Sequence, residues 1–174
     1  ILTGGLLPTA IVSPSTNLTF QIYELPSSWQ VPSLLLCGLV LGSRAATIST
    51  IAYLVIGLFY LPVFHGGGSI GYLATPDFGY LAGFIPAVWV TGRMAWKSKK
   101  NSLFHLYKAT ITGLTIIHAI GIINLILGTL LARWPESFLK LFIQFSLSTF
   151  PIQLMLCTGV VLIARLLRKT LILQ

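Results

Sequence analysis

Residues 33–61 read SLLLCGLVLGSRAATISTIAYLVIGLFYL, an apolar stretch interrupted only by Gly42-Ser43-Arg44. If this stretch were one membrane helix, Arg44 would lie near the bilayer centre, at a cost of roughly 2.5–3.5 kcal/mol. A break at Gly42-Ser43 places the arginine at a membrane face instead. The sequence therefore predicts two helices, 31–42 and 44–60. The first is too short to span a bilayer alone, so we expect it to pack against other parts of the protein.

The composition extends this interpretation to the whole chain. Of the 174 residues, 55% are hydrophobic and 8% are charged, and the mean hydropathy is +0.90. A soluble domain needs more surface charge to stay in water. The sequence therefore predicts a single all-α integral membrane domain, 1–174. Further helices are expected at about 1–12, 76–96, 104–131 and 151–169, giving six transmembrane helices, with an interfacial helix at about 135–149. Thr75 and Pro76 are typical of a helix start.

The charges indicate the orientation in the membrane. With six helices, one face receives nine of the eleven lysines and arginines: Arg44, Arg93, Lys97, Lys99, Lys100, Lys108, Arg165, Arg168 and Lys169. The other face receives Arg133, Lys140 and all three carboxylates, Glu24, Asp77 and Glu136. The positive-inside rule makes the first face cytoplasmic, with both termini on it, in a multi-pass protein of the cell membrane. The net charge of +8 is then a topology signal, aided by anionic lipid, and requires no nucleic acid.

The outward loops, 13–30, 61–76 and 132–150, are the longest irregular segments and predict a ligand pocket beneath them. Several of their residues can serve either a ligand or the fold. The Gly66-Gly67-Gly68 run can offer backbone N–H donors or form a tight turn. Asp77 and Tyr80 can face the pocket, or complement a helix dipole and anchor at the interface.

Three further positions carry suitable polar or aromatic groups. Trp29 can stack on a ligand ring or belong to the interfacial aromatic belt, and Gln30 can pair with an amide or ureido group. Gln153 needs a partner, either a neighbouring helix or a ligand. His65 and His118 have no second ligand at metal spacing. Three carboxylates and no Ser/His/Asp set give little support to an enzyme, so we expect no catalytic residue, metal or cofactor.

Three segments together resemble the BioY family, the biotin-binding S components of energy-coupling factor (ECF) importers. The family's Pro-Val-Pro-Ile-Thr-Leu-Gln, followed by Gly-Leu-x-Leu-Gly, is similar to 24–30 followed by Gly-Leu-Val-Leu-Gly at 38–42. Its Gly-Leu-Pro-Val-Phe with trailing glycines resembles 60–68, which contains Phe64. Its Gly-Pro-Thr-Gly-Gly-Tyr-Leu-x-Gly-Phe resembles 75–84.

The resemblance implies capture of extracellular biotin, with a transmembrane coupling subunit and two ATPase subunits supplying energy. The family's last helix opens Pro-Gly-Asp-x-x-Lys, whereas this chain has Pro151-Ile152-Gln153 and Leu156 in place of the lysine. We expect Asp77 to supply the missing carboxylate, and Arg133 or the Gly66–Gly68 amides to bind the ligand's carboxylate. The alternatives are an S component for another vitamin, a structural subunit of a membrane complex and, third, a membrane enzyme.

Overall fold

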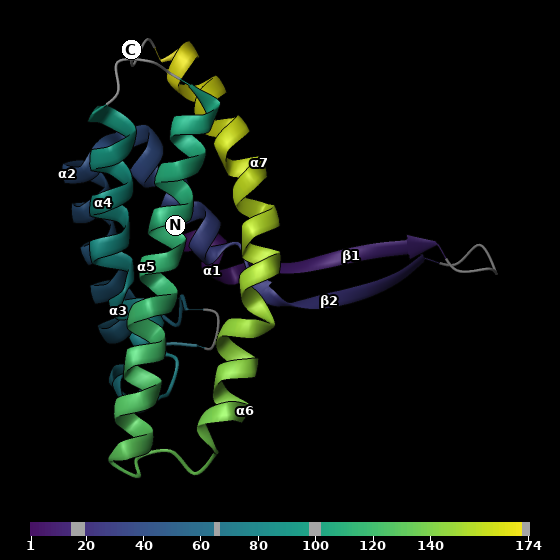
Figure 1. Ribbon diagram of the computed structural model, residues 1–174, viewed down its shortest axis with the longest axis vertical. Helices are drawn as coiled ribbons and strands as arrows, with labels where there is room; N and C mark the ends of the chain where they lie inside the picture. The colour runs from purple at the N-terminus through teal and green to yellow at the C-terminus, as the bar shows by residue number, and fades with distance from the viewer. Residues whose placement is uncertain (15–19, 65–66, 98–101, 172–174) are drawn as a thin grey trace.

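The computed structural model describes residues 1–14, 20–64, 67–97 and 102–171 (Figure 1). Its long helices run side by side: α2 (Gln30–Phe59), α4 (Phe84–Lys97), α5 (Leu103–Leu130) and α7 (Thr149–Thr170). The shorter elements are α1 (Leu2–Leu6), β1 (Pro8–Pro14), β2 (Phe20–Ser28), the 3₁₀ turn η1 (Ile70–Ala74), α3 (Phe78–Ala82), α6 (Phe138–Phe142) and the π-helical η2 (Ile143–Leu147). Three described stretches are long and apolar enough to cross a membrane, namely α2, α5 and Phe138–Thr170. The expected count of six is therefore not confirmed.

The break in α2 lies at the predicted place. Gly42 has φ 79° and ψ 175°, a conformation that only glycine adopts without strain. The helix folds back on itself there, as shown by the hydrogen bond from the Gln30 side chain to Tyr53, 23 positions away. Its first arm, residues 30–41, is about 18 Å long at the α-helical rise and cannot span a bilayer alone. Arg44, directly after the turn, is exposed, as expected from the cost of burying it.

Small residues let α2 and α4 approach closely. A Cβ on Gly92 would meet the backbone nitrogen of Ser43 at 2.5 Å, so α4 presses directly against the turn in α2. Between these helices and α5 lies a core of fully buried side chains: Leu34, Leu35, Ala87, Val88, Leu114 and Ile117. A second cluster, including Leu39, Leu106, Val160 and Ala164, packs α7 against the end of the bundle nearer to Gly42.

Two side chains donate to the carbonyl oxygen of Leu39, three residues before the turn at Gly42. Arg168 donates from Nη1 to the carbonyl oxygens of Leu39 (3.3 Å) and Ala95 (3.1 Å). Trp96 donates from Nε1 to the same Leu39 oxygen (3.2 Å), and the Arg168 guanidinium lies 5.1 Å from the Trp96 ring. The end of α7 is thereby tied to the first arm of α2 and to α4.

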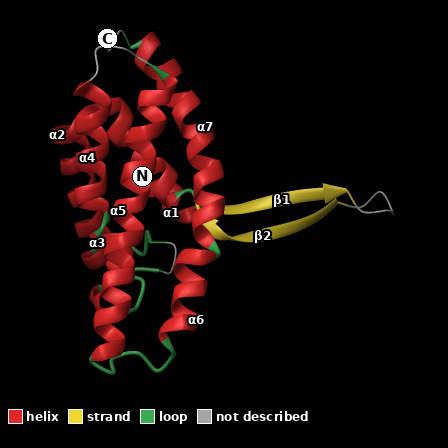
Figure 2. Ribbon diagram, viewed as in Figure 1, coloured by secondary structure: helices red, strands yellow, loops and turns green. Residues whose placement is uncertain are grey.

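The prediction of a first helix at 1–12 is wrong. Only Leu2–Leu6 is helical, and Pro8–Pro14 forms strand β1. Proline at position 8 cannot continue the helix, and β-branched residues such as Ile11 and Val12 suit a strand. The segment 13–30, expected to be a loop, contains β2, which pairs antiparallel with β1 from Thr9↔Leu25 to Pro14↔Phe20. This hairpin extends sideways from the bundle (Figure 2), so the protein is predominantly rather than wholly helical.

Two other boundaries differ from the sequence prediction. The helix expected at 76–96 begins at Phe78, and the Thr75 hydroxyl donates to the Tyr72 carbonyl and does not cap the helix. The segment 135–149 is not a separate interfacial helix. Residues 138–170 form one long helical stretch in which η2 is a π-bulge, and Figure 1 shows α6 continuing from the lower end of α7.

Candidate functional site

A small cavity of about 100 Å³ lies where β2 enters α2, between η1, α3, α5, η2 and α7. Four of the predicted site residues meet there: Gln30, Asp77, Tyr80 and Gln153. The other lining residues are Ser27, Ser28, Val31, Tyr72, Leu81, Phe84, Ile117, Phe145 and Thr149. The walls are mainly apolar and aromatic, with a few convergent polar groups, which is the usual composition of a small-molecule site.

Asp77 is the only charged residue among those that line the cavity. Its Oδ2 accepts a hydrogen bond from the Tyr72 hydroxyl. Burial and the neighbouring Asp77 carboxylate raise the pKa of Tyr72 above its usual range, so the phenol keeps its proton and donates. The other carboxylate oxygen, Oδ1, has no hydrogen bond to the described residues and is available to a ligand N–H. Tyr72 was not among the residues that the sequence predicted.

Four polar side chains form a hydrogen-bonded chain beside the cavity, and the residues at its two ends, Tyr80 and Gln153, line it. The Tyr80 hydroxyl lies 2.6 Å from Ser146 Oγ, which lies 3.2 Å from His118 Nδ1. His118 Nε2 lies 3.0 Å from Gln153 Oε1. Because an amide oxygen can only accept, His118 Nε2 carries the proton and Nδ1 accepts from Ser146, which in turn accepts from Tyr80. The amide nitrogen of Gln153, a residue that lines the cavity, remains as a hydrogen-bond donor.

Contacts between the two arms of α2 position Gln30 at the cavity. Gln30 donates from Nε2 to Tyr53 Oη (2.8 Å), and Tyr53 donates onward to the Val63 carbonyl (3.0 Å). The Ser28 hydroxyl receives the backbone N–H of Gln30 at 3.4 Å. Ser27 is 4% exposed, and its hydroxyl has no partner in the described structure, an unusual state for a buried polar group.

The remaining predicted residues that the structure describes do not line this cavity. The Trp29 side chain is 36% exposed. Phe64 is buried, with its ring 5.5 Å from the Tyr53 ring and 5.1 Å from the Tyr72 ring. Gly67 uses its N–H within the loop, donating to the Phe64 carbonyl at 3.0 Å.

Two glycines and one arginine are the other residues that the sequence predicted for the site. Gly68 is packed against the backbone of Pro62 and the carbonyl of Gly57, so it serves a tight loop. Arg133 is exposed, with its guanidinium 5.4 Å from the Trp134 ring. Gly66, like His65, lies outside the described residues.

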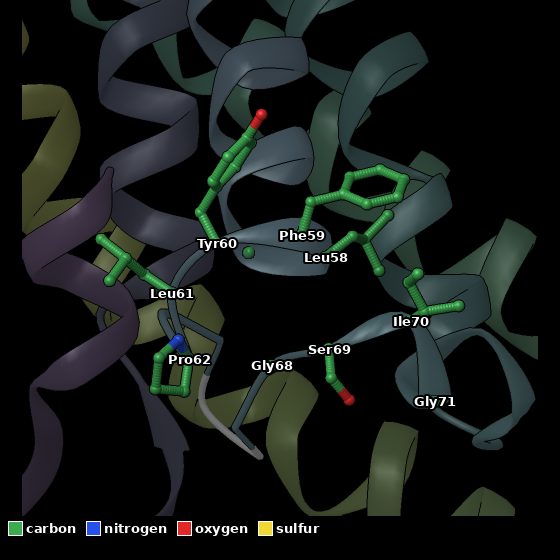
Figure 3. Close-up of a pocket in the computed structure, with 10 residues that line it drawn as sticks. Leu58, Phe59, Tyr60, Leu61, Pro62, Gly68, Ser69, Ile70 and Gly71 are labelled. Atoms are coloured by element: carbon green, nitrogen blue, oxygen red, sulfur yellow. The ribbon is translucent and has the colours of Figure 1, made fainter.

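A larger hollow, of about 570 Å³, lies beside the outward loop at residues 57–62 and 68–71 (Figure 3). It is open and mostly apolar, and its two side-chain hydroxyls, of Tyr60 and Ser69, point away from each other in Figure 3. No carboxylate or amide side chain lines it. Because its polar groups do not converge, we place the candidate site in the smaller cavity at Asp77.

Sequence inspection could not find the hydrogen-bonded chain of Tyr80, Ser146, His118 and Gln153. These residues lie on four different elements, and the 28 positions between His118 and Ser146 include the end of α5 and the loop before α6. A polar residue inside an apolar helix was the available signal for His118, since such a group needs a partner. The identity of that partner depended on how η2 packs against α5.

Comparisons with known proteins agree with this architecture. A family model described as the BioY family matches residues 3–172. A protein of Lysinibacillus sphaericus, named as a probable biotin transporter BioY, is 34% identical over 146 residues, covering 81% of this chain and 74% of that protein. An uncharacterized 21.2 kDa protein of Cyanophora paradoxa is 33% identical over 165 residues, covering 95% and 85%.

A solved structure has a similar fold. The crystal structure of the S-component for biotin from an ECF-type ABC transporter superposes with a TM-score of 0.74 at 23% identity. The match covers 97% of this chain and 84% of that one. Because the family model matches nearly the whole of this chain and the relatives are more than 30% identical, this chain belongs to the BioY family.

Proposed function

We propose that this chain captures biotin at the outer face of the cell membrane and delivers it inward as the substrate-specific subunit of an ECF-type importer. The observation that carries the proposal is the cavity shared by Gln30, Asp77, Tyr80 and Gln153 in a member of the BioY family. The named relative and the similar solved structure are both described as biotin proteins. Binding and release of biotin by this chain break no covalent bond, so the proposal assigns no catalytic residue, metal or cofactor to it.

The polar groups of the cavity suit the ureido ring of biotin. That ring has one carbonyl oxygen, which accepts, and two N–H groups, which donate. Asp77 offers a free carboxylate oxygen as acceptor, and Gln153 offers amide N–H donors. The phenyl rings of Phe84 and Phe145 provide apolar surface for the rest of the bicyclic system. Trp29, Phe64, Gly66, Gly67, Gly68 and Arg133 are left out of this proposed contact set.

The orientation follows from the charges. Arg44 and Arg168 lie by the Gly42 turn, at the opposite end of the bundle from the cavity. The positive-inside rule makes the Gly42 end cytoplasmic and the cavity end external, with the C-terminal end of α7 in the cytoplasm. Ile1 lies beside Cys37, within the first arm of α2 and not at either end of the bundle. The cytoplasmic position expected for the N-terminus therefore stays a prediction.

We propose five membrane-embedded segments from the described structure: the two arms of α2, then 78–97, α5 and α7. The sixth expected segment, 1–12, contributes only the five residues of α1. Large apolar side chains on the outside, including Ile48 (69% exposed) and Leu166 (65% exposed), would face lipid. The chain carries no nucleotide-binding motif, so the proposed partners are a coupling subunit and two ATPase subunits.

Equilibrium binding of labelled biotin to the detergent-purified protein tests the proposal, with thiamine, riboflavin and desthiobiotin as competitors. We expect saturable binding that only biotin-like compounds displace. Displacement by thiamine or riboflavin would instead indicate an S component for another vitamin. No vitamin binding by a folded sample would reject the transport proposal and favour a structural subunit.

A further inference from the structure

We propose that the cavity holds only the neutral ring system of its ligand and leaves the ligand's carboxylate outside. The site would then bind amide and ester conjugates of biotin as tightly as the free acid. This inference rests on the proposed function and concerns the substrate class of the same site. Three features carry it: the polarity of the cavity groups, the distribution of cations and the size of the cavity.

The groups that line the cavity suit a neutral hydrogen-bonding head. Asp77 Oδ1 accepts, Gln153 Nε2 donates, and the unpartnered Ser27 hydroxyl can do either. The direction of the Gln153 amide is fixed by His118, which occupies its oxygen. A cyclic urea, with its adjoining acceptor and donors, satisfies all three groups. A carboxylate has acceptors only, so it would leave the Asp77 oxygen without a donor and repel it.

Cations are missing from the cavity and from the sequence around it. The chain has no lysine or arginine at 1–43 or at 45–92, the regions that supply Ser27, Gln30 and Asp77. The outward cations are Arg133, which lies over Trp134, and Lys140, which is paired with Glu136 at 2.6 Å. Neither lines the cavity. A carboxylate placed inside would therefore meet a like charge and no fixed opposite charge among the described residues.

The volume gives a separate argument. Sites that enclose drug-sized ligands usually measure roughly 300–1,000 Å³, whereas this cavity measures about 100 Å³. A cavity needs roughly 10–15 Å³ of such space to hold one water molecule, so this one suits a small ring system without its acyl chain. The pentanoate tail would extend out of the cavity, with its terminal carboxylate in water.

The test compares the dissociation constants of biotin, its methyl ester and its primary amide for the detergent-purified chain. We expect the three values to agree within about threefold, because neutralising a solvated carboxylate changes no contact. If a fixed cation held the carboxylate, the neutral analogues would bind roughly ten- to a hundredfold more weakly. That result would overturn this inference and leave the biotin proposal intact, whereas loss of all biotin binding would overturn both.

Two variants sharpen the comparison. Asp77→Asn should weaken binding of the acid and the ester by the same factor, because the carboxylate lies outside the reach of Asp77. A change in the acid-to-ester ratio of more than about fivefold would place the ligand's carboxylate beside Asp77 and contradict the inference. Arg133→Gln should leave the ratio unchanged; selective loss of affinity for the acid would show that Arg133 holds the carboxylate.

Discussion

Gln30 and Tyr53 are 23 positions apart in α2, yet Gln30 Nε2 lies 2.8 Å from Tyr53 Oη. A straight helix would separate them by about 34 Å at a rise of 1.5 Å per residue. The contact therefore defines α2 as two antiparallel arms that reverse at Gly42. It also connects the fold to the site, because Gln30 lines the cavity and Tyr53 carries the hydrogen bond on to the loop at Val63.

Tyr53→Phe should destabilise the protein by about 1–3 kcal/mol. The substitution removes the acceptor of Gln30 and the donor to Val63, and it leaves buried polar groups without partners. Thermal unfolding in detergent measures the effect. Tyr60→Phe is the matched control, since Tyr60 is 76% exposed, and it should change the midpoint little. Equal midpoints for the two variants would contradict the structural role of Tyr53.

Gly42→Ala should cost about 1–3 kcal/mol, because φ 79° with ψ 175° is strained for any residue with a Cβ. The new methyl would also approach Trp96 Nε1 at 3.3 Å. Gly159→Ala serves as control: Gly159 is exposed on α7 with open space at its Cβ, so alanine there should be neutral or stabilising. Urea or thermal titration of both variants tests the expectation, which fails if Gly42→Ala unfolds like the unmodified protein.

Asp77→Asn should weaken biotin binding roughly ten- to a hundredfold, because a charge-assisted hydrogen bond contributes about 1.5–3 kcal/mol. The change keeps the size of the side chain and an acceptor for Tyr72. Glu136→Gln removes an outward carboxylate that is engaged with Lys140 on the surface, and its affinity should equal that of the unmodified chain. Isothermal titration of the two variants with biotin measures the affinities. Unchanged affinity in Asp77→Asn would show that the Asp77 carboxylate does not bind the ligand.

His118→Ala should reduce biotin affinity by about tenfold through Gln153. Without the ring, the Gln153 amide loses the partner that orients it, and Ser146 loses its acceptor. A double-mutant cycle distinguishes this positioning role from a general loss of structure. In a Gln153→Ala background, His118→Ala should add little further loss. Additive losses in the cycle would show that the two residues act independently.

Arg168→Met should destabilise the protein by about 1–3 kcal/mol. Methionine keeps apolar contact with Trp96 but leaves the Ala95 carbonyl without its donor and the Leu39 carbonyl with Trp96 alone. Lys169→Met is the control, because Lys169 is exposed one position further along α7. Comparison of their unfolding midpoints measures the difference. A midpoint for Arg168→Met no lower than that of Lys169→Met would show that the Arg168 contacts add no stability.

The sequence determined the features that depend on composition and local preference. Membrane character followed from the apolar content, and the break in α2 followed from the cost of Arg44 in hydrocarbon together with an adjacent glycine. Motif order over residues 24–84 was enough to indicate the BioY family, which the family model and the relatives confirm. Gln30, Asp77, Tyr80 and Gln153 were all proposed from residue type and position near an outward end.

Local preference also misled at the beginning of the chain. The run from Ile1 to Val12 is apolar enough for a helix, but Pro8 and the β-branched residues after it favour a strand once a partner strand is present. The pairing of β1 with β2 is a contact between segments, and hydropathy carries no information on it.

Only the tertiary structure decided which polar residues share a cavity. Tyr72 in η1 donates to Asp77. His118 in α5 lies within hydrogen-bond distance of Ser146 in η2 and of Gln153 in α7. Phe64 and Gly67 were equally plausible site residues from their motif, but their backbones hydrogen-bond to each other. Buried polar groups must find partners, but the sequence does not specify which partner packing brings within 3 Å.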